Sequence, residues 1–470
     1  MIGRRVASLL VASLVGACSD PPRPIAPIAE SGELVVLTVN GPVTYFEDAQ
    51  GLPSGFEYDL ATLFARDLNA KPAFVLVDDP TKIDRLLRAG QAHLSAAGLA
   101  RHFDFPGGLA WGPPYLTTQH QVVGRIGEGA RPKALRDLAA KRVGVIEESV
   151  AEYLLLAPSL QALHVERLPA GTSTADMLER VARGELDYAL VESTRFTLAR
   201  RYFPGLEVVF DVGKPVEYAW LVSSIDKRRI LDAARPFFER IRKDGTLKRL
   251  VDRHYSHAAR ITTLDSETLI ERIQTQLPAL RPHFVEAEGV SGIDWRLVAA
   301  IGYQESHWDP HATSPTGVRG LMMLTEETAD RLQIKDRLDP RDSIVGGARY
   351  LALLKEAMSP RLVEPDRTFM ALAAYNLGVG HLEDARLLTQ RAGLNPDKWQ
   401  DVRQVLPRLA EPEHFQTTKH GYARGFEAQR LVDNVRNYYD ILARMAPREA
   451  VLAGPAPEPQ LSTKGTASGR

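Results

Sequence analysis

Hydrophobic residues form two kinds of pattern along the first half of the chain. Short runs rich in valine, leucine and isoleucine alternate with stretches that carry an apolar residue at every third or fourth position. The runs predict buried β-strands and the stretches predict amphipathic helices, an alternation typical of α/β units with largely parallel sheets. We expect strands at 33–39, 73–77, 93–97, 142–146, 187–191 and 218–222, and helices at 58–68, 82–88, 175–183 and 228–243.

In the second half of the chain the helical spacing dominates. Ser291 and Asp294 precede apolar residues at helical spacing, which is typical of a helix N-cap with an acidic partner. Asp342 resembles the cap of a second helix, and Gly378 is expected to end a third. The sequence therefore predicts an N-terminal α/β part and an all-α C-terminal domain, which meet near residues 257–280.

The composition is that of a globular protein with several domains. A chain of 470 residues exceeds the usual size of one domain, and its 44% hydrophobic and 25% charged residues exclude wholesale disorder and a polytopic membrane protein. Because 58 Lys+Arg stand against 59 Asp+Glu, the basic excess of nucleic-acid-binding proteins is missing. The 12 histidines form no His-Glu-x-x-His or comparable cluster, so we predict no metal and no cofactor.

The N-terminus has the form of a secretory signal. Two arginines precede an apolar run over 6–17 that is too short to span a bilayer. The run ends at Cys18, the only cysteine, so no intramolecular disulfide is possible. Val15-Gly16-Ala17-Cys18 resembles the bacterial lipobox, which implies a signal peptide over 1–17 and a lipid on Cys18. An incidental cysteine is the alternative.

The two ends of the chain are expected to lie outside the folded domains. Ser19 follows the cysteine where an aspartate would signal inner-membrane retention, so the lipobox resemblance favours the periplasmic face of the outer membrane. The proline-rich stretch at 18–32 predicts a stiff tether between lipid and first domain. Residues 451–470 are rich in proline, serine and glycine and predict a disordered tail.

The strongest candidate for chemistry is Glu305. It lies four residues after Ile301 and seven after Val298, on the apolar stripe of a predicted helix that Pro310 is expected to end. Burial there would raise the pKa of the carboxylate, as a general acid near neutral pH requires. A buried structural glutamate paired with an arginine is the alternative.

Two later blocks add polar side chains. Residues 314–324 form a glycine-punctuated stretch that reads Ser-Pro-Thr-Gly-Val-Arg-Gly-Leu-Met-Met-Leu. Residues 373–378 read Ala-Ala-Tyr-Asn-Leu-Gly, and Asn376 lies seven residues after Phe369 and three after Ala373, so we expect it to point inward. A buried asparagine needs hydrogen-bond partners, and the amide or hydroxyl of a sugar is one candidate.

The sequence resembles the family 1 lytic transglycosylases through three motifs in the same order. These are the Glu-Ser pair, the serine- and glycine-rich stretch that ends in Gly-Leu-Met, and Ala-Tyr-Asn. Segments 339–351 and 422–428 add further matches, and the resemblance covers about residues 275–445. It implies a goose-lysozyme-like helical fold and a lyase that acts on peptidoglycan between MurNAc and GlcNAc. Glu305 would protonate the glycosidic oxygen and then take the proton of the C6 hydroxyl, while the N-acetyl group of the substrate stabilises the cation.

The same resemblance implies the residues that hold the sugar. Tyr375 and Asn376 would support the sugar and its N-acetyl group, and Ser306 and Ser314 would orient Glu305 or the substrate. Helix or loop capping is the alternative for the serines and for Asn376. Met322 is expected either to line the cleft or to fill the core.

Two departures from the family pattern concern the cleft. Met323 stands where the family often has glutamine, and Leu431 stands where a tyrosine often precedes the late valine. The Gly-Leu-Met-Met-Leu version resembles the membrane-bound F subgroup, which also carries an N-terminal solute-binding-like module and a lipid anchor.

Residues 33–257 resemble the family 3 bacterial solute-binding domains through segments 55–60, 143–149 and 184–192. The resemblance implies two α/β lobes of the periplasmic-binding-protein kind with a ligand between them. Ser149 would hold a ligand carboxylate at a helix N-terminus, and Glu192 would hold an amino group. Arg101 is a tentative carboxylate clamp, although it lies further from Tyr115 than the family spacing suggests; a surface role is the alternative.

The expected plan is a signal peptide (1–17), a tether (18–32), a non-catalytic regulatory solute-binding-like module (33–257), a transglycosylase domain (258–450) and a tail (451–470). The expected partners are peptidoglycan strands, a muropeptide or amino acid at the module, and the outer membrane, with no nucleic acid. Ligand binding at the module is hypothesised to change access to Glu305. One alternative is a lipid-anchored sensor whose helical domain only binds glycan. Another is a hydrolytic muramidase, which would need a second carboxylate.

Overall fold

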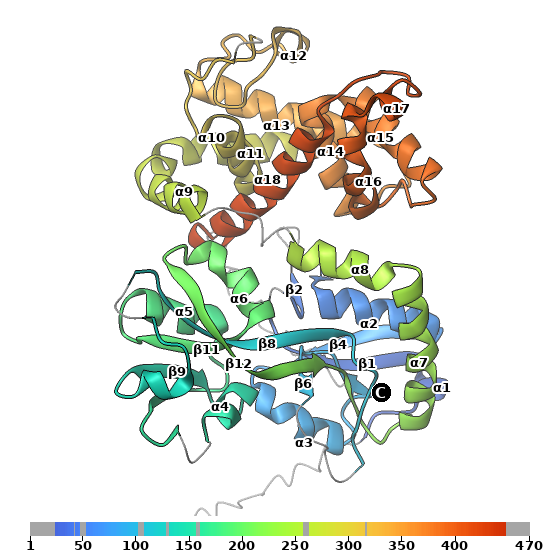
Figure 1. The fold of residues 1–470 in the computed structure, drawn as a ribbon. Helices are drawn as coiled ribbons and strands as arrows, with labels where there is room; N and C mark the ends of the chain where they lie inside the picture. Colours follow the sequence, from blue (N-terminus) through green and yellow to red (C-terminus); the bar gives the residue numbers. More distant parts are fainter. Residues whose placement is uncertain are drawn as a thin grey trace, which may run out of the picture. The chain divides into compact units, whose positions relative to one another are not determined.

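A computed structural model of the chain describes residues 24–41, 43–47, 53–101, 108–127, 131–156, 160–256, 263–314 and 317–447. It divides into two compact units, Met1–Ser256 and His257–Arg470, which are described separately (Figure 1). The expected signal peptide, Cys18 and the tail lie outside the described residues. No helix in the described ranges is long and apolar enough to cross a bilayer.

The N-terminal unit has two main sheets, which confirms the expected two-lobed α/β architecture (Figure 1). The first sheet has the order β4-β1-β5-β13-β7, in which β4, β1 and β5 are parallel and β13 is antiparallel to both of its neighbours, β5 and β7. Helices α2, α7 and α8 bury their apolar faces on one side of it. The bounds are β1 (Glu33–Thr38), α2 (Phe56–Asp67), β4 (Lys71–Leu76), α3 (Ile83–Arg88), β5 (Leu94–Ser95), β7 (Ala110–Trp111), β13 (Leu221–Val222), α7 (Lys227–Lys243) and α8 (Thr246–Val251).

The second sheet has the order β10-β9-β11-β8-β12-β6. Only β10, β9 and β11 are parallel; β8 is antiparallel to β11 and β12, so the expectation of largely parallel sheets is wrong for this lobe. Both long strands mix polar with apolar residues, as antiparallel strands with one solvated face do, and therefore lack a continuous apolar run. The bounds are β6 (Ala100–Arg101), β8 (Leu116–Arg125), β9 (Arg142–Ile146), α4 (Val150–Leu155), β10 (His164–Leu168), α5 (Thr174–Ala182), β11 (Tyr188–Glu192), α6 (Ser193–Ala199) and β12 (Leu206–Tyr218).

Three described segments carry the chain between these two sheets: 96–99, 112–115 and 219–220. They are hydrogen-bonded to one another and to the adjoining strand end, because Ala219 N–H donates to the carbonyl of Leu99 (3.2 Å) and Tyr115 N–H donates to the carbonyl of Tyr218 (3.0 Å). We call these three segments the crossover segments. Their pairing makes them a common hinge region for the two lobes.

The C-terminal unit is helical throughout its described part, which confirms the expected all-α domain (Figure 1). Helices α10, α11, α13, α14 and α18 pack around a core of fully buried aliphatic and aromatic side chains. The bounds are α9 (Thr263–Thr275), α10 (Leu277–Ser291), α11 (Trp295–Ser306), α12 (Glu326–Arg331), α13 (Pro340–Ala357), α14 (Asp366–Leu377), α15 (Val379–Arg391), α16 (Trp399–Val405), α17 (Pro412–Phe415) and α18 (Gly425–Met445).

Two helix starts differ from the expected caps. Asp294 alone caps α11, by accepting from Arg296 N–H at 2.8 Å, while Ser291 is the last residue of α10. The cap of α13 is Asp339, which accepts from the N–H of Asp342 at 2.8 Å. Pro340 follows as the first helical residue, a position that needs no N–H, so the cap lies three residues before the expected Asp342.

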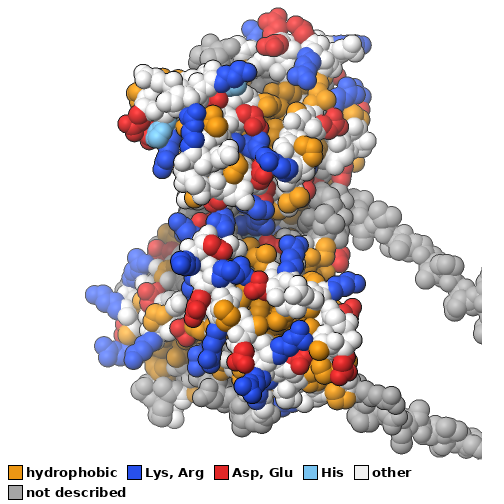
Figure 2. Space-filling view, turned by 90° about the vertical axis from the view of Figure 1, so that its right-hand side faces the viewer, with side chains coloured by type: hydrophobic (Ala, Val, Ile, Leu, Met, Phe, Trp, Pro, Cys, Tyr) orange, Lys and Arg blue, Asp and Glu red, His pale blue; other side chains and the backbone are white. Residues whose placement is uncertain are grey.

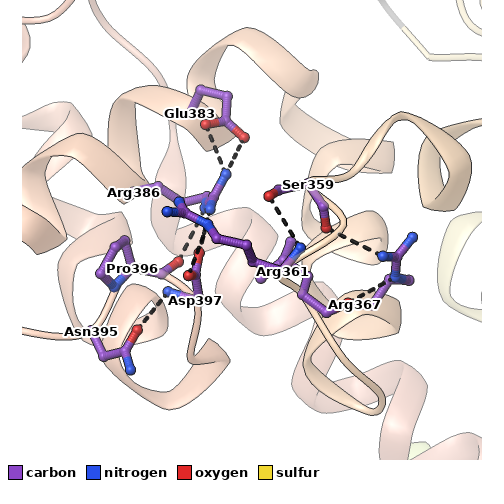
Figure 3. A network of polar contacts seen from close by, with 9 residues as sticks. Ser359, Arg361, Arg367, Glu383, Arg386, Asn395, Pro396 and Asp397 are labelled. Carbon is purple, nitrogen blue, oxygen red and sulfur yellow. Dashed lines mark hydrogen bonds and ion pairs between the residues drawn. The ribbon is translucent and has the colours of Figure 1, made fainter.

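Buried arginines hold loops in the second half of this unit. Arg386 on α15 donates to Glu383, to the carbonyl of Pro396 (3.0 Å) and to Asp397 (2.5 Å), as Figure 3 shows. In the same view Arg367 donates to main-chain carbonyls of the turn before α14. These contacts fix the loops on either side of α14 and α15. On the surface in Figure 2, basic and acidic side chains are interspersed, in keeping with a net charge of -1.

The pair between Arg403 on α16 and Asp433 on α18 is almost fully buried, with Nε–Oδ1 and Nη2–Oδ2 distances of 3.1 and 2.5 Å. Replacing Arg403 by leucine would remove the guanidinium that pairs with the buried carboxylate of Asp433, so we expect a loss of about 3–5 kcal/mol in the free energy of unfolding of this unit. The double variant Arg403→Leu/Asp433→Leu should recover a large part of that loss. Urea titrations followed by circular dichroism measure both; equal losses in the single and double variants would contradict the argument.

Candidate active site around Glu305

Glu305 lies in the last turn of α11. Val298 and Ile301, which share its side of the helix, are fully buried, whereas Glu305 is partly buried. The helix ends at Ser306, earlier than Pro310 requires, because His307 and Trp308 take left-handed backbone conformations (φ 53° and 61°). Trp308 is buried and its Nε1–H donates to the carbonyl of Ala299 at 2.8 Å. This contact locks the helix end that carries Glu305.

The environment of Glu305 favours the protonated acid. Burial alone raises the pKa of its carboxyl to about 7. Among the described residues it has no hydrogen-bond or ion-pair partner, so the alternative of a structural glutamate paired with an arginine finds no such arginine there. A carboxyl group with this pKa can hold a proton near neutral pH and can also release it.

Ser306 connects α11 to the glycine-rich stretch. Its Oγ–H lies 2.8 Å from the carbonyl of Leu321 and 3.2 Å from that of Gly302, so it holds the loop against the helix. Gly320 in this loop has φ 83°, and a Cβ there would overlap the carbonyl oxygen of Arg337. Ser314 is partly buried and closes a turn, with its N–H donating to the carbonyl of Val318 at 3.0 Å.

Tyr375 and Met322 are linked by a hydrogen bond in the neighbourhood of Glu305. The Tyr375 hydroxyl donates to the carbonyl of Met322 at 2.9 Å. Burial and then the neighbouring charge of Glu305 raise the pKa of Tyr375 well above its ordinary value, which places the two side chains in one site. The side chain of Met322 is fully buried, and a Cβ on Gly347 would lie 2.6 Å from its methyl group. Met322 thus fills the core and faces the site through its carbonyl group.

Asn376 is exposed, so the expectation that it points inward is wrong. Phe369, on which the spacing argument rested, is itself only partly buried; it contacts Trp399 at a tilted angle of 57°, and the guanidinium of Arg436 lies over its ring. Residues 370–374 of α14 are buried on all sides of the helix, and Asn376 lies in its last turn, beyond this buried stretch. Its amide is therefore open to solvent or to a ligand.

The two departures from the family pattern have different surroundings. Met323 has φ 48° and a partly exposed side chain, so the polar glutamine of the family pattern would keep contact with solvent at this position. Leu431 is 4% exposed and packs in the core on α18.

The three expected ligand residues of the N-terminal unit do not converge through direct contacts. Ser149 caps α4: its Oγ accepts from Glu152 N–H (3.2 Å) and donates to the carbonyl of Ile146 (2.6 Å). Glu192 accepts from Arg195 Nε–H at 2.5 Å and from the Tyr218 hydroxyl at 2.6 Å, so its charge is already paired. Arg101 is exposed on β6 and pairs by register with Glu217.

The sequence analysis missed Glu57 as a candidate. This side chain is 2% exposed and accepts one hydrogen bond from each crossover segment: Gly98 N–H (3.0 Å), Trp220 Nε1–H (3.0 Å) and the Tyr115 hydroxyl. Burial nevertheless raises its pKa to about 7. A glutamate three residues before the buried Leu60 on an amphipathic helix was the available signal.

One surface cluster among the described residues has the composition of a metal site. Ligand atoms of Glu411, Glu413 and His414 lie within 4.8 Å of one another. Both glutamates are exposed, and His414 already pairs with Glu411 at 3.3 Å. Nothing else there points to an ion.

Because Glu305 is forced into a desolvated position, it should lower stability once ionised. Its pKa rises from 4.5 to about 7 on folding, so wild-type stability falls as pH rises through this interval. Glu305→Gln should therefore stabilise the C-terminal unit above pH 7 by on the order of 2 kcal/mol, allowing for partial exposure, and change little below pH 4.5. Denaturant titrations at several pH values test this; a gain that is independent of pH would contradict it.

Each of the two units matches a family of known proteins. Residues 34–257 match the family described as bacterial extracellular solute-binding proteins, family 3, and residues 283–396 match the transglycosylase SLT domain. Among solved structures, an amino acid ABC transporter substrate-binding protein of Streptococcus pneumoniae covers 50% of this chain and 99% of its own (18% identity, TM-score 0.45). An arginine-binding protein of T. maritima covers 49% and 97% (21% identity, TM-score 0.44).

Relatives match nearly the whole chain. The membrane-bound lytic murein transglycosylase F of Nitrosospira multiformis is 44% identical over 93% of this chain and 91% of its own. That of Methylobacillus flagellatus is 40% identical over 95% of each chain. The resemblance drawn from the sequence motifs is confirmed. The chain therefore belongs to the membrane-bound lytic murein transglycosylase F family.

Proposed function

We propose that this protein is a peptidoglycan lytic transglycosylase that cleaves the MurNAc-β-1,4-GlcNAc bond without water and leaves 1,6-anhydroMurNAc ends. The observation that carries the proposal is Glu305: a desolvated carboxyl with a pKa of about 7, beside Tyr375 and within the family motif. Such a group can act first as an acid and then as a base at the same pH.

The proposed reaction uses one carboxyl twice. Glu305 donates its proton to the glycosidic oxygen, and the C1–O bond breaks while the N-acetyl oxygen of MurNAc attacks C1. The Glu305 carboxylate then takes the proton of the C6 hydroxyl, whose oxygen displaces the acetamide oxygen from C1. The ring closes, the acetamide is restored, and Glu305 is protonated again for the next cycle.

Neighbouring residues are assigned supporting roles. Ser306 and the Met322 carbonyl would position the loop and Tyr375 around Glu305, in keeping with the hydrogen bonds that they make. Exposed Asn376 and partly buried Ser314 and Tyr375 would contact the sugar and its N-acetyl group. Met322 would thus contribute through its main chain.

Two other readings of the site are less well supported. A hydrolase would use a second carboxylate to activate water, and two carboxyls in one site raise each other's pKa values. Among the described residues, burial is the sole cause of the raised Glu305 pKa, and no other carboxylate contributes to it. A domain that only binds glycan gains nothing from a desolvated acid, which costs stability.

We also propose that the enzyme is a lipoprotein, anchored through Cys18 to the periplasmic face of the outer membrane. The lipobox-like Val15-Gly16-Ala17-Cys18, the short apolar run before it and Ser19 after it support this location. The names of the relatives, which include the word membrane-bound, agree with an attachment to a membrane.

The N-terminal unit is proposed to bind a small molecule, such as a wall-derived muropeptide or amino acid, and to regulate the enzyme. The match to extracellular solute-binding proteins supports such a ligand. Two-lobed modules of this kind close around a ligand by hinge motion, so that ligand binding is converted into a movement of the lobes.

The first functional test is to digest purified peptidoglycan and analyse the products by mass spectrometry. Wild-type protein should release fragments that end in 1,6-anhydroMurNAc, at a rate that falls above pH 7 as Glu305 loses its proton. Glu305→Gln is isosteric but cannot transfer the proton, so we expect its rate to fall by about 100-fold or more. Glu356→Gln, the same substitution at an exposed position of α13, serves as the matched control.

Reducing-end MurNAc as the main product would instead support the hydrolase. Comparable turnover by Glu305→Gln would remove the catalytic assignment.

The second functional test concerns the anchor. Cys18→Ser removes the only thiol that could carry a lipid, so this variant should move from the detergent phase to the aqueous phase in a phase-partitioning experiment. Wild type and Cys18→Ser partitioning equally into detergent would contradict the lipoprotein proposal.

A further inference from the structure

Arg195 on α6 presents a guanidinium group that is anchored on one edge only. Its Nε–H donates to Glu192 at 2.5 Å, and the same carboxylate accepts from the Tyr218 hydroxyl at 2.6 Å. These contacts fix the plane of the guanidinium relative to β11 and to the end of β12. The orientation of the remaining edge is thereby set by the fold.

The other edge of the guanidinium is open. The Arg195 side chain is 40% exposed, and among the described residues its side-chain partners are Glu192 and Tyr218, whose hydroxyl lies 2.6 Å from the same Glu192 oxygen that accepts from Nε–H. A Cβ on Gly98 would lie 3.8 Å from Nη2, so this edge faces the first crossover segment between the lobes. Two adjacent N–H groups in one plane match the geometry of a carboxylate.

The residues expected to bind a ligand cannot supply this chemistry. The hydroxyl of Ser149 is used by its own helix, and Arg101 is exposed on an edge of the second sheet. The carboxylate of Glu192 is paired with the guanidinium of Arg195, so it would bind the ammonium group of a ligand only weakly. The charge that remains available for a ligand is the positive one of Arg195.

We propose that Arg195 is the anion-binding group of the N-terminal unit, that its Nη1–Nη2 edge clamps the carboxylate of a small ligand, and that binding is coupled to protonation of Glu57. The proposal concerns the solute-binding module and does not depend on the catalytic proposal for Glu305.

The coupling follows from the charges around Glu57. Its carboxylate faces Arg195 from α6, Tyr115 from the second crossover segment and Tyr255 from the segment after α8. Glu57 has a pKa of about 7 and is stabilised as an anion by the Arg195 charge. A ligand carboxylate at Arg195 would compete for that charge and repel the Glu57 anion, so binding should take up a proton and weaken as pH rises through 7.

A second titratable group lies on the same helix and must be separated from Glu57. Asp59 on α2 pairs with His254 (2.9 Å) and Arg253 (3.2 Å) from the segment after α8. Glu57→Gln isolates the Glu57 contribution, because it leaves this neighbouring triad unchanged.

The test measures binding of three matched probes to the full chain by isothermal titration calorimetry. N-acetylalanine carries only a carboxylate, its amide carries no charge, and alaninamide carries only an ammonium. We expect saturable binding of N-acetylalanine, with at least about tenfold weaker binding of the other two. Failure of N-acetylalanine to bind, or tighter binding of alaninamide, would overturn the proposal.

Variants then assign the site. Arg195→Gln should weaken N-acetylalanine binding about tenfold or more. Because that change leaves Glu192 unpaired, Glu192→Gln/Arg195→Gln is made alongside it; this double variant contains no orphan charge and should lose binding equally. Arg200→Gln, at an exposed arginine five residues further on, is the matched control and should bind normally. A loss with Arg101→Gln in place of Arg195→Gln would restore the expected clamp and overturn the proposal.

The proton is followed by repeating the titration in two buffers with different ionisation enthalpies, about one pH unit below and above the Glu57 pKa of about 7. Wild type should take up a proton on binding and bind more tightly at the lower pH. Glu57→Gln should bind without proton uptake and with little pH dependence. Unaltered proton uptake in Glu57→Gln would overturn the coupling. Peptidoglycan cleavage by each variant, measured in parallel, shows separately whether the catalytic proposal holds.

Discussion

The burial of one carboxyl group without a partner is the constraint on which the C-terminal unit depends. Water would stabilise the ionised form of Glu305, and the fold removes much of that water without supplying a cation among the described residues. The surrounding helices must hold this unfavourable position through packing alone. Fully buried neighbours on α11 and the locked indole of Trp308 provide that support.

The loop beside Glu305 is positioned mainly through its main chain. Ser306 binds the carbonyl of Leu321, Tyr375 binds the carbonyl of Met322, and Ser343 accepts from the N–H of Met322 at 3.1 Å. Main-chain contacts of this kind depend on loop conformation more than on the side chains of the loop itself. They explain why Gly320, whose conformation and lack of a Cβ the loop requires, is as important to the site as the residues that face it.

In the part of the chain that the structure describes, each unit holds one glutamate whose pKa is raised by burial, Glu57 and Glu305, but their surroundings differ. Glu57 receives hydrogen bonds from all three crossover segments and sits close to Arg195, so its proton is linked to the geometry of the hinge region. Glu305 receives none among the described residues, so its proton remains available for transfer. The first arrangement suits a ligand-responsive module and the second suits an acid catalyst.

Local patterns predicted the elements well, and they predicted Glu305 because its helix carries a regular apolar stripe. The same reasoning failed for Asn376, since spacing from Phe369 assumed that Phe369 belongs to the core. Antiparallel β8 and β12 were missed because their polar faces interrupt the apolar runs. Glu57 could not be recognised, because its partners Gly98, Tyr115 and Trp220 lie 41, 58 and 163 residues away in the sequence.

The most direct test of this account is to titrate the carboxyl group of Glu305 itself. Carbon-13 NMR of protein labelled at glutamate side-chain carboxyls, with Glu305→Gln to assign the resonance, reports the pKa of that one group. The account predicts a midpoint of about 7, set by burial alone. A midpoint near the ordinary value of 4.5 would show that water or an unseen cation stabilises the ionised form, and would contradict the assignment of Glu305 as an acid poised for catalysis.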